Sequence, residues 1–265
     1  MTLPQNLKFI GLLIKMKLSR MMAFRFSFFG ASIVNIIGFS IQIIMFAVIY
    51  GQVDAIGDWN QGQMLIFFGT FSLINSLHLT IFCFGLVDIP RKIREGLLDL
   101  YLTKPGNPLL RLTFENMDPG SALLVLFSAG IIGWGTAKDG VTLTPLLLMG
   151  YIGLVLCMTL LWYDVFLILR TLSFFIVSTS AIERLEGDVI TLNFKLPGTV
   201  YKGFVRILFW TALPYGVMAT VPAQWLTGTW TLYRLLYALG VAAFFTVFAL
   251  WFWRFGLKRY KSASS

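Results

Sequence analysis

The sequence predicts an all-α, polytopic membrane protein with six transmembrane helices, an amino-terminal interfacial helix and an outer re-entrant helical hairpin. Of its 265 residues, 57% are hydrophobic and only 12% are charged, and the mean hydropathy is +0.79. Soluble domains carry about 25% charged residues, so most of this chain must lie in a membrane. Long apolar runs alternate with short polar loops. We therefore expect one transmembrane domain over residues 1–265.

The charge balance favours lipid as a partner and argues against nucleic acid. The formal net charge is +9, from 21 Lys and Arg against 12 Asp and Glu. Basic residues beside apolar spans mark cytoplasmic loops and contact anionic headgroups. We expect the membrane surface, and not a nucleic acid, to be the partner of these side chains.

The amino-terminal part predicts a helix on the membrane surface followed by the first span. Over 3–22, apolar residues repeat at helical spacing and most of the lysines fall off that stripe, which favours an interfacial helix. Phe24 to Tyr50 is long enough to cross with some tilt. Asn35 and Gln42 lie within it and are expected to face other helices or a substrate path.

Four further apolar runs and two turns follow before the last span. The loop 51–62 carries two Asp and no Lys or Arg, which favours the outside. Asp164 and Arg170 are interpreted as bracketing a tight cytoplasmic turn, because residues 143–182 are too long for one crossing. The remaining expected spans are Gln63–Val87, Gly120–Trp134, Leu143–Tyr163, Ile168–Ile182 and Tyr233–Phe255.

Residues 197–222 predict a re-entrant hairpin on the outer side. The apolar core of this stretch is bounded by Pro197 and Pro222 and is interrupted by Pro214. A proline inside a helix removes a hydrogen bond and costs about 3 kcal/mol or more. The segment could also cross the membrane. Basic flanks at both termini place both ends in the cytoplasm, so the number of crossings must be even, and this favours two short helices that dip and return.

The loop 88–111 is the most charged stretch between two spans. Asp88–Pro108 holds four of the chain's Lys and Arg, and each such charge would cost about 2.5–3.5 kcal/mol at mid-bilayer. Ile93, Leu98 and Tyr101 recur at near-helical spacing, and Pro105 ends the pattern. We expect a short amphipathic cytoplasmic helix that can dock a soluble partner.

Motifs for chemistry within the chain are absent from the sequence. No Gly-x-x-x-x-Gly-Lys-Ser/Thr phosphate loop occurs, so we expect no ATP site here. No His/Cys group has metal-ligand spacing and no catalytic set converges, so we predict no catalytic residue, no metal and no cofactor in this chain. Asn75 and His78 lie within the second span, where they are polar contacts between helices or part of a substrate path.

Three stretches together resemble the permeases of ABC transporters of the type-two exporter class. Ile93-Arg-Glu-Gly-Leu-Leu-Asp-Leu-Tyr-Leu-Thr-Lys-Pro105 is similar to the cytoplasmic loop of small six-span bacterial permeases with an Ile-Arg-x-Gly-x-Leu-Asp pattern. Leu196-Pro197, Leu213-Pro214 and Val221-Pro222-Ala223 resemble the outer hairpin of that class, although the subgroup commonly has Tyr where Leu196 stands. Gly256–Ser264 resembles the carboxyl terminus of the subgroup.

The resemblance implies a permease subunit of an ATP-driven exporter in the bacterial plasma membrane. Two permeases, identical or related, would form the substrate path, and separate ABC ATPase subunits would bind ATP and Mg below them. A stand-alone channel or secondary transporter is the alternative, and a membrane-embedded enzyme is a third. The residues that would couple to the ATPase are Arg91, Ile93, Arg94, Glu95, Gly96, Leu98, Asp99, Tyr101, Lys104 and Pro105.

Overall fold

The computed structural model describes residues 55–104, 106–176 and 178–260, with isolated positions between 11 and 52. The predicted interfacial helix at 3–22 and the first span at Phe24–Tyr50 therefore lie outside the described residues. The long helices are α3 (Gln61–His78), α8 (Ala122–Asp139), α9 (Pro145–Thr171), α10 (Ser180–Lys195) and α14 (Leu232–Arg259). The short elements are β1 (Ala55–Ile56), β2 (Trp59–Asn60), α4 (Phe84–Val87), α5 (Ile89–Arg94), α6 (Asp99–Leu102), α7 (Pro108–Glu115), α11 (Gly203–Ile207), α12 (Tyr215–Met218) and α13 (Thr220–Leu226).

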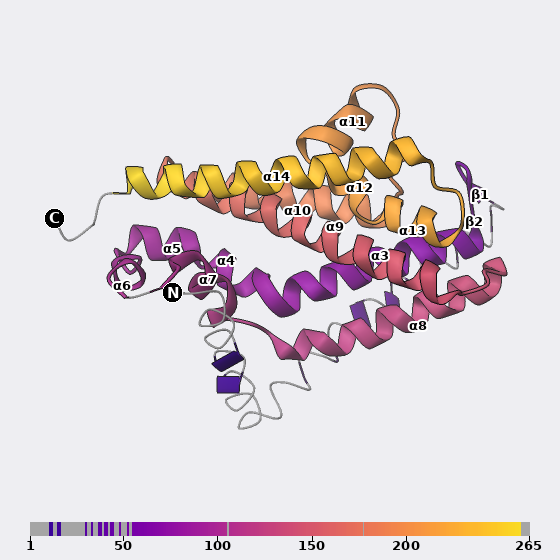
Figure 1. The fold of residues 1–265 in the computed structure, drawn as a ribbon, viewed down its shortest axis with the longest axis horizontal. Helices are drawn as coiled ribbons and strands as arrows, with labels where there is room; N and C mark the ends of the chain where they lie inside the picture. Colours follow the sequence, from indigo (N-terminus) through magenta and orange to yellow (C-terminus); the bar gives the residue numbers. More distant parts are fainter. Residues whose placement is uncertain are drawn as a thin grey trace.

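Helices dominate, and four of the described ones are long and apolar enough to cross a membrane. These candidate spans are Gln61–Arg94, Pro119–Asp139, Pro145–Phe174 and Leu232–Arg259. In Figure 1 the long helices run along the long axis of the molecule, with α5 and α6 at one end and β1, β2 and α13 at the other. The chain is an all-α, multi-pass membrane protein, as the sequence predicts.

The loops before α3 and after α8 meet at the β1–β2 end. Asn60 caps α3, and its amide Nδ2 donates a hydrogen bond of 2.8 Å to Oδ1 of Asp139. A Cβ on Gly62 would lie 2.8 Å from the Cβ of Asp139, so the two loops pack without room for a side chain. The chain turns after α8 at Gly140, whose φ of +70° is the left-handed geometry that glycine adopts most readily. The sequence predicted a turn from 135, and the helix runs one turn further.

Aromatic side chains form the core between α3, α9 and α10. The ring of Phe71 lies 5.3 Å from Trp162 and 4.9 Å from Phe194, in edge-to-face geometry. Such aromatic pairs add about 0.5–1.5 kcal/mol beyond the area they bury. The core therefore ties α10, which is a polar helix, to two of the candidate spans.

The predicted turn between a fourth and a fifth span is wrong. Residues 145–171 form one continuous helix, α9, and both Asp164 and Arg170 lie on it with exposed fractions of 1% and 5%. Asp164 Oδ2 accepts a hydrogen bond of 2.6 Å from the hydroxyl of Thr246 on α14. Charges normally mark a span end, but these two have partners inside the bundle, so the helix continues past them.

The predicted fifth span at Ile168–Ile182 is also wrong. The chain leaves α9 through a 3-10 turn, Leu172–Phe174, and the next helix is α10. α10 carries several charged residues and is not among the candidate spans. Its 16 residues would measure about 24 Å. Its last turn packs against α3, where the rings of Phe194 and Phe68 lie 4.7 Å apart.

The segment predicted as a hairpin consists of two helical parts joined by a sharp bend. Gly203–Ala212 and Tyr215–Leu226 meet at Leu213-Pro214 and are bent by 79° relative to each other. We expected both parts to be buried, and the start of the first is not: Phe204 and Ile207 on α11 are 76% and 64% exposed, whereas Phe209 and Trp210 after them are buried. α12 and most of α13 are buried. A bend of this kind fits a broken span as well as a re-entrant loop, so the hairpin stays a prediction.

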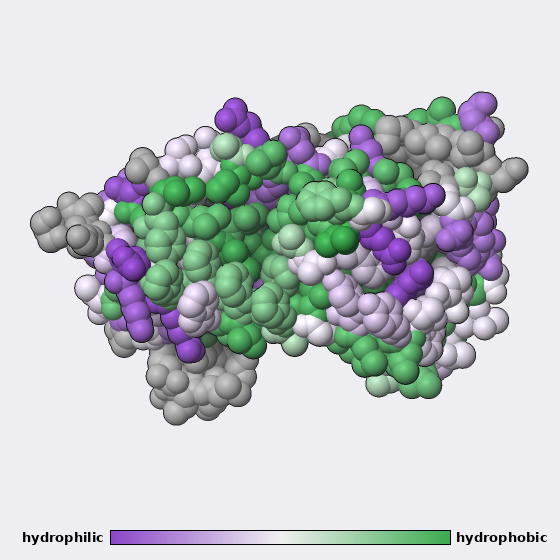
Figure 2. Space-filling model, turned by 90° about the horizontal axis from the view of Figure 1, so that it is seen from above, coloured by the Kyte–Doolittle hydropathy of each residue, from purple (hydrophilic) through white to green (hydrophobic). Residues whose placement is uncertain are grey.

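The outer surface suits a lipid environment. Figure 2 shows apolar side chains over a broad area of the face seen from above, the face toward which α14 lies in Figure 1. Exposed apolar residues of α14 include Phe244, Val247 and Trp251, at 64%, 71% and 56%. A soluble monomer rarely exposes a continuous apolar area of this kind, whereas a membrane span must.

Candidate functional site

The predicted amphipathic helix of the cytoplasmic loop is two short helices instead of one. α5 ends at Arg94, a turn covers Glu95–Leu98, and α6 follows. Gly96 in this turn has φ of +70°, a backbone geometry that helices do not contain. The near-helical spacing that predicted one helix is therefore broken at this glycine. Pro105 lies outside the described residues.

One side of the loop anchors it to the bundle. Leu98 is fully buried, and Tyr101 and Lys92 are 9% and 4% exposed. The Lys92 ammonium lies 4.6 Å from the centroid of the Tyr101 ring, and the Arg111 guanidinium on α7 lies 4.9 Å from the same centroid. Lys92 Nζ also lies 3.5 Å from Asp88 Oδ2. These contacts fix the loop relative to the ends of the spans.

The other side of the loop is exposed and mixes charged with apolar side chains. Arg91 binds Asp88 through Nε and Nη2 at 2.7 and 3.0 Å, and Glu95 through Nη1 at 3.0 Å. Leu100 and Leu102 are 58% and 41% exposed. Exposed ion pairs add little stability, about 0–1 kcal/mol. We call this exposed set the coupling surface; it comprises Arg91, Arg94, Glu95, Leu100, Leu102 and Lys104.

The loop is also close to the ends of α9 and α14. Partial burial and the nearby Asp99 carboxylate raise the pKa of Tyr260, which follows α14 directly. The Tyr260 ring lies 6.1 Å from that of Phe174, which follows α9. Of the predicted coupling residues, Ile93 is half-buried, while Leu98 and Tyr101 face the bundle. The loop therefore lies close to three span ends.

Of the four residues predicted to line a substrate path, the structure describes two, Asn75 and His78. His78 is 3% exposed, its ring stacks on Trp162 at 5.2 Å, and the ring of Phe166 lies 4.7 Å away. Asn75, one turn earlier, is half-buried. Asn35 and Gln42 lie outside the described residues. His78 therefore sits in an aromatic core between α3 and α9.

A buried ion pair lies beside His78, and sequence reasoning missed it. Arg170 Nη2 donates a hydrogen bond of 2.8 Å to Glu186 Oε2, and the Tyr215 hydroxyl donates one of 3.1 Å to Glu186 Oε1. The Arg170 guanidinium lies 4.3 Å from the Phe166 ring centroid. Glu183 Oε1, on a half-exposed side chain, lies 3.5 Å from Arg170 Nη1. The pair joins α9, α10 and α12, which lie far apart in sequence. An Arg within an apolar run was the signal that could have predicted it.

The comparison with protein families decides what kind of membrane protein this is. The family described as ABC-2 family transporter protein matches residues 36–264. The chain belongs to this family. No curated protein and no solved structure matches it at the threshold applied. It is thus an ABC-2 transporter permease, a membrane protein that carries substrate, and the resemblance stated from the three stretches above is confirmed at the level of the family.

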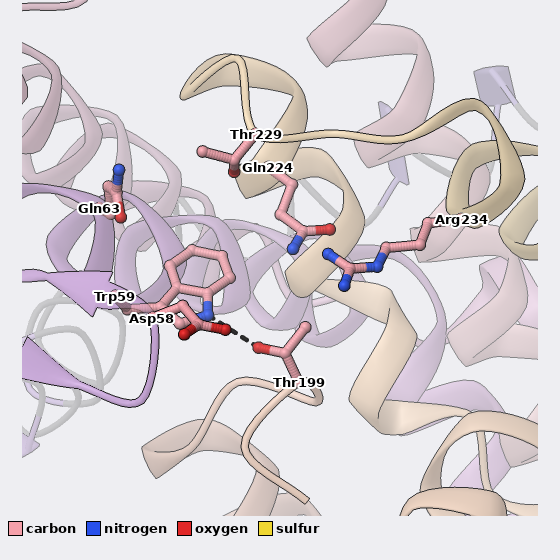
Figure 3. Close-up of a pocket in the computed structure, with 7 residues that line it drawn as sticks. All are labelled: Asp58, Trp59, Gln63, Thr199, Gln224, Thr229 and Arg234. Atoms are coloured by element: carbon pink, nitrogen blue, oxygen red, sulfur yellow. Dashed lines mark hydrogen bonds between the residues drawn. The ribbon is translucent and has the colours of Figure 1, made fainter.

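This ABC-2 permease also has a polar pocket at its β1–β2 end, which no sequence pattern predicted. The pocket has a volume of about 210 Å³. In Figure 3 Arg234 enters from one side, Asp58 and Trp59 from the other, and Gln224 and Thr199 lie between them. The Trp59 indole Nε1 donates a hydrogen bond of 2.8 Å to Thr199 Oγ1. The lining residues are Asp58, Trp59, Gln63, Thr199, Gln224, Thr229 and Arg234.

Within the described residues, no group of three or more His, Cys, Asp or Glu could hold a metal ion. Cys83 and Cys157 are half-buried free thiols. The arrangement has an exposed charged and apolar surface at one end of the bundle, a buried ion pair inside it and a polar pocket at the other end.

Proposed function

We propose that this permease is the membrane-spanning subunit of an ATP-driven exporter. It forms the substrate path with a second copy or a related permease, and separate ATPase subunits, which hold ATP and Mg, drive it through the coupling surface. The observation that carries this proposal is the position of that surface at the end of one helical stretch, Gln61–Arg94. A stretch of 34 residues would measure about 50 Å, so it reaches from the pocket end to the loop.

A displacement of the loop would be transmitted because the loop is anchored on its inner side. Leu98 and Tyr101 are buried against the bundle, and Lys92 and Arg111 both lie against the Tyr101 ring. A partner that pushes on Leu100 or Leu102 therefore moves α5 and α7 and not only a loose loop. ATP binding on the partner would in this way change the packing around α3 and open a path outward.

The proposal places the protein in the bacterial plasma membrane with both termini in the cytoplasm. The coupling surface must then face the cytoplasm, where soluble ATPases are found. The basic stretch Arg254–Lys261 supports this side for the carboxyl terminus, because Lys and Arg are concentrated in cytoplasmic segments.

Co-purification tests the docking role. The tagged chain is expressed with the ABC ATPase subunit of its own transporter, and the complex is isolated in detergent. Changing Leu100 and Leu102 to Ser removes two exposed apolar side chains, each worth about 1.5–3 kcal/mol when fully buried by a partner. We expect at least about tenfold weaker binding, since 1.4 kcal/mol is a factor of ten.

The matched control is Leu143→Ser, a leucine with 54% exposure in the loop between α8 and α9 at the opposite end of the bundle. This variant should retain the ATPase as the unmodified chain does. Equal retention of the ATPase by the Leu100/Leu102 variant and the control would show that the coupling surface is not the contact.

The buried Arg170–Glu186 pair favours a second candidate function, a secondary transporter driven by an ion gradient, because ionisable groups inside the membrane often form coupling sites. Transport assays in membrane vesicles distinguish the ATP-driven exporter from the secondary transporter. Transport that needs ATP and survives collapse of the ion gradients supports the exporter, and transport that an ionophore abolishes in the presence of ATP supports the alternative.

A further inference from the structure

The pocket between β2, α13 and α14 has a lining of opposite charges that are not paired with each other. Asp58 and Arg234 approach it from opposite sides in Figure 3. Within the described residues neither side chain has an ion-pair or hydrogen-bond partner. We propose that this pocket binds a small zwitterion, in which an ammonium group and an acidic group are joined by a short linker.

In the part of the chain that the structure describes, the lining offers two oxygen acceptors without a partner, the exposed Asp58 carboxylate and the buried amide oxygen of Gln224. Gln224 is 4% exposed, and its carbonyl Oε1 has no hydrogen-bond donor within the described residues. A buried polar atom without a partner costs free energy, and native structures rarely contain one without a water, an ion or a ligand to explain it. An ammonium group has three donors and can bind the Asp58 carboxylate. In Figure 3 Gln224 Oε1 points toward Arg234, so this free acceptor is available to a donor of the ligand that lies between the two charges.

Donors on the other side match the acidic group. Arg234 presents a planar guanidinium, which binds phosphate and carboxylate oxygens in pairs. The pocket therefore separates an anion-binding side from a cation-binding side, which a ligand of one charge would not satisfy.

The size of the pocket limits the ligand further. Pockets for drug-sized molecules measure about 300–1,000 Å³, and this one measures about 210 Å³. Asp58 and Thr229 are exposed, so the ligand can enter from the surface at this end. Phosphoethanolamine has the required chemistry, either as a free solute or as the headgroup of a lipid. Trp225 and Trp230, with ring centroids 5.0 Å apart, lie beside the pocket residues in the chain and are typical of a headgroup-level belt.

The ligand would join parts of the chain that are far apart. Asp58 and Trp59 belong to the β1–β2 turn and strand, Thr199 to the segment after α10, Gln224 to α13 and Arg234 to α14. Occupation of the pocket should therefore raise the thermal stability of the purified chain, because a ligand that binds only the folded state stabilises it.

Phosphoethanolamine is the probe for the first experiment. The full-length chain in detergent, without any ATPase, is titrated by calorimetry and by the fluorescence of the tryptophans, of which Trp59 lines the pocket. We expect saturable binding and a higher Tm. Inorganic phosphate and ethylamine, which each carry one of the two charges, should bind at least about tenfold more weakly. Binding of phosphate equal to that of phosphoethanolamine would overturn the proposal.

Variants place the binding in this pocket. Asp58→Asn and Arg234→Gln each remove one charge and should each weaken phosphoethanolamine binding at least about tenfold. Arg184→Gln and Asp188→Asn remove exposed charges of α10 outside the pocket and are the matched controls. Wild-type affinity in both pocket variants would contradict the assignment, as would the absence of binding in detergent together with the absence of co-purified lipid.

The source of the ligand is decided in nanodiscs. If the natural occupant is a lipid headgroup, discs of phosphatidylethanolamine should block binding of free phosphoethanolamine, whereas discs of phosphatidylglycerol should permit it. If the occupant is a free solute, phosphoethanolamine should bind equally in both. These binding measurements need no ATPase and no transport. A negative result would therefore contradict the pocket proposal without contradicting the proposed exporter function, and failure of the exporter function would leave the pocket proposal intact.

Discussion

Glu186 joins two other helices inside the bundle. Its two carboxylate oxygens accept hydrogen bonds from Arg170 and Tyr215, on two other helices. A buried ion pair is weak evidence for net stability, because desolvation offsets the attraction. Breaking such a pair is costly, since it leaves one charge buried without its partner. The pair therefore determines how α9, α10 and α12 are arranged and adds little net stability to the fold.

Neutralising Glu186 should therefore destabilise the chain. We expect Glu186→Gln to lower the free energy of unfolding by about 3 kcal/mol or more, the range for a buried pair that loses one partner. Glu183→Gln is the control, because the Glu183 side chain is 43% exposed and its ion pair with Arg170 is screened by solvent, worth under about 1 kcal/mol. The Tm of each variant in detergent measures the difference. An equal loss of Tm in the two variants would show that the buried Arg170–Glu186 pair contributes no more to stability than the exposed contact of Glu183.

At the scale of elements, the bent segment between α10 and α14 begins and ends at the same end of the bundle. Thr199, which precedes α11, and Thr229, which follows α13, line the same pocket. Between them, Tyr215 at the start of α12 reaches inward to Glu186. A segment that starts and returns at one end while its middle dips inward is the geometry expected of a re-entrant hairpin, and this supports that prediction.

Cysteine labelling tests the hairpin. Single cysteines replace Lys195 and Thr229 in a chain without Cys83 and Cys157, and both should react with an impermeant thiol reagent from outside intact cells. Gln224 is a poor probe because it is 4% exposed. Reaction at only one of the two positions would mean that the bent segment crosses the membrane.

At the scale of the molecule, α10 connects the two ends of the bundle where the sequence predicted a span at Ile168–Ile182. α9 ends beside the loop that contains α5, and Thr199 lies at the opposite end, in contact with Trp59. The chain between them must travel the length of the bundle, and α10 is the helix that does so in Figure 1. α10 is not among the candidate spans, so six spans with both termini on one side stay a prediction.

The same labelling background tests that topology. Cysteines in place of Asp58 and Asp139 should react from outside, because their loops meet at the pocket end. Cysteines in place of Lys104 and Ser264 should react only after the membrane is permeabilised. Reaction of Ser264→Cys in intact cells would require an odd number of crossings and would overturn the six-span arrangement.

The sequence by itself determined the class of the molecule and the positions of most apolar spans. Solvent preference is a property of composition, and a long apolar run such as Leu232–Arg259 has few alternatives to crossing a bilayer. The Gly96 turn shows the limit of this reasoning at short range. Helical spacing predicts which residues could share a face, but a single glycine decides whether the helix continues.

Only the tertiary structure decided the roles of the charged and polar side chains. Asp164 and Arg170 were expected to bracket a turn, because an unpaired charge is costly in a membrane, and no role was predicted for Glu186. Their partners, Thr246, Glu186 and Tyr215, lie 82, 16 and 29 residues away in sequence. The pocket likewise combines side chains from Asp58 to Arg234. Contacts between residues so far apart depend on how the helices pack, and the pattern of apolar and polar residues along the sequence does not predict them.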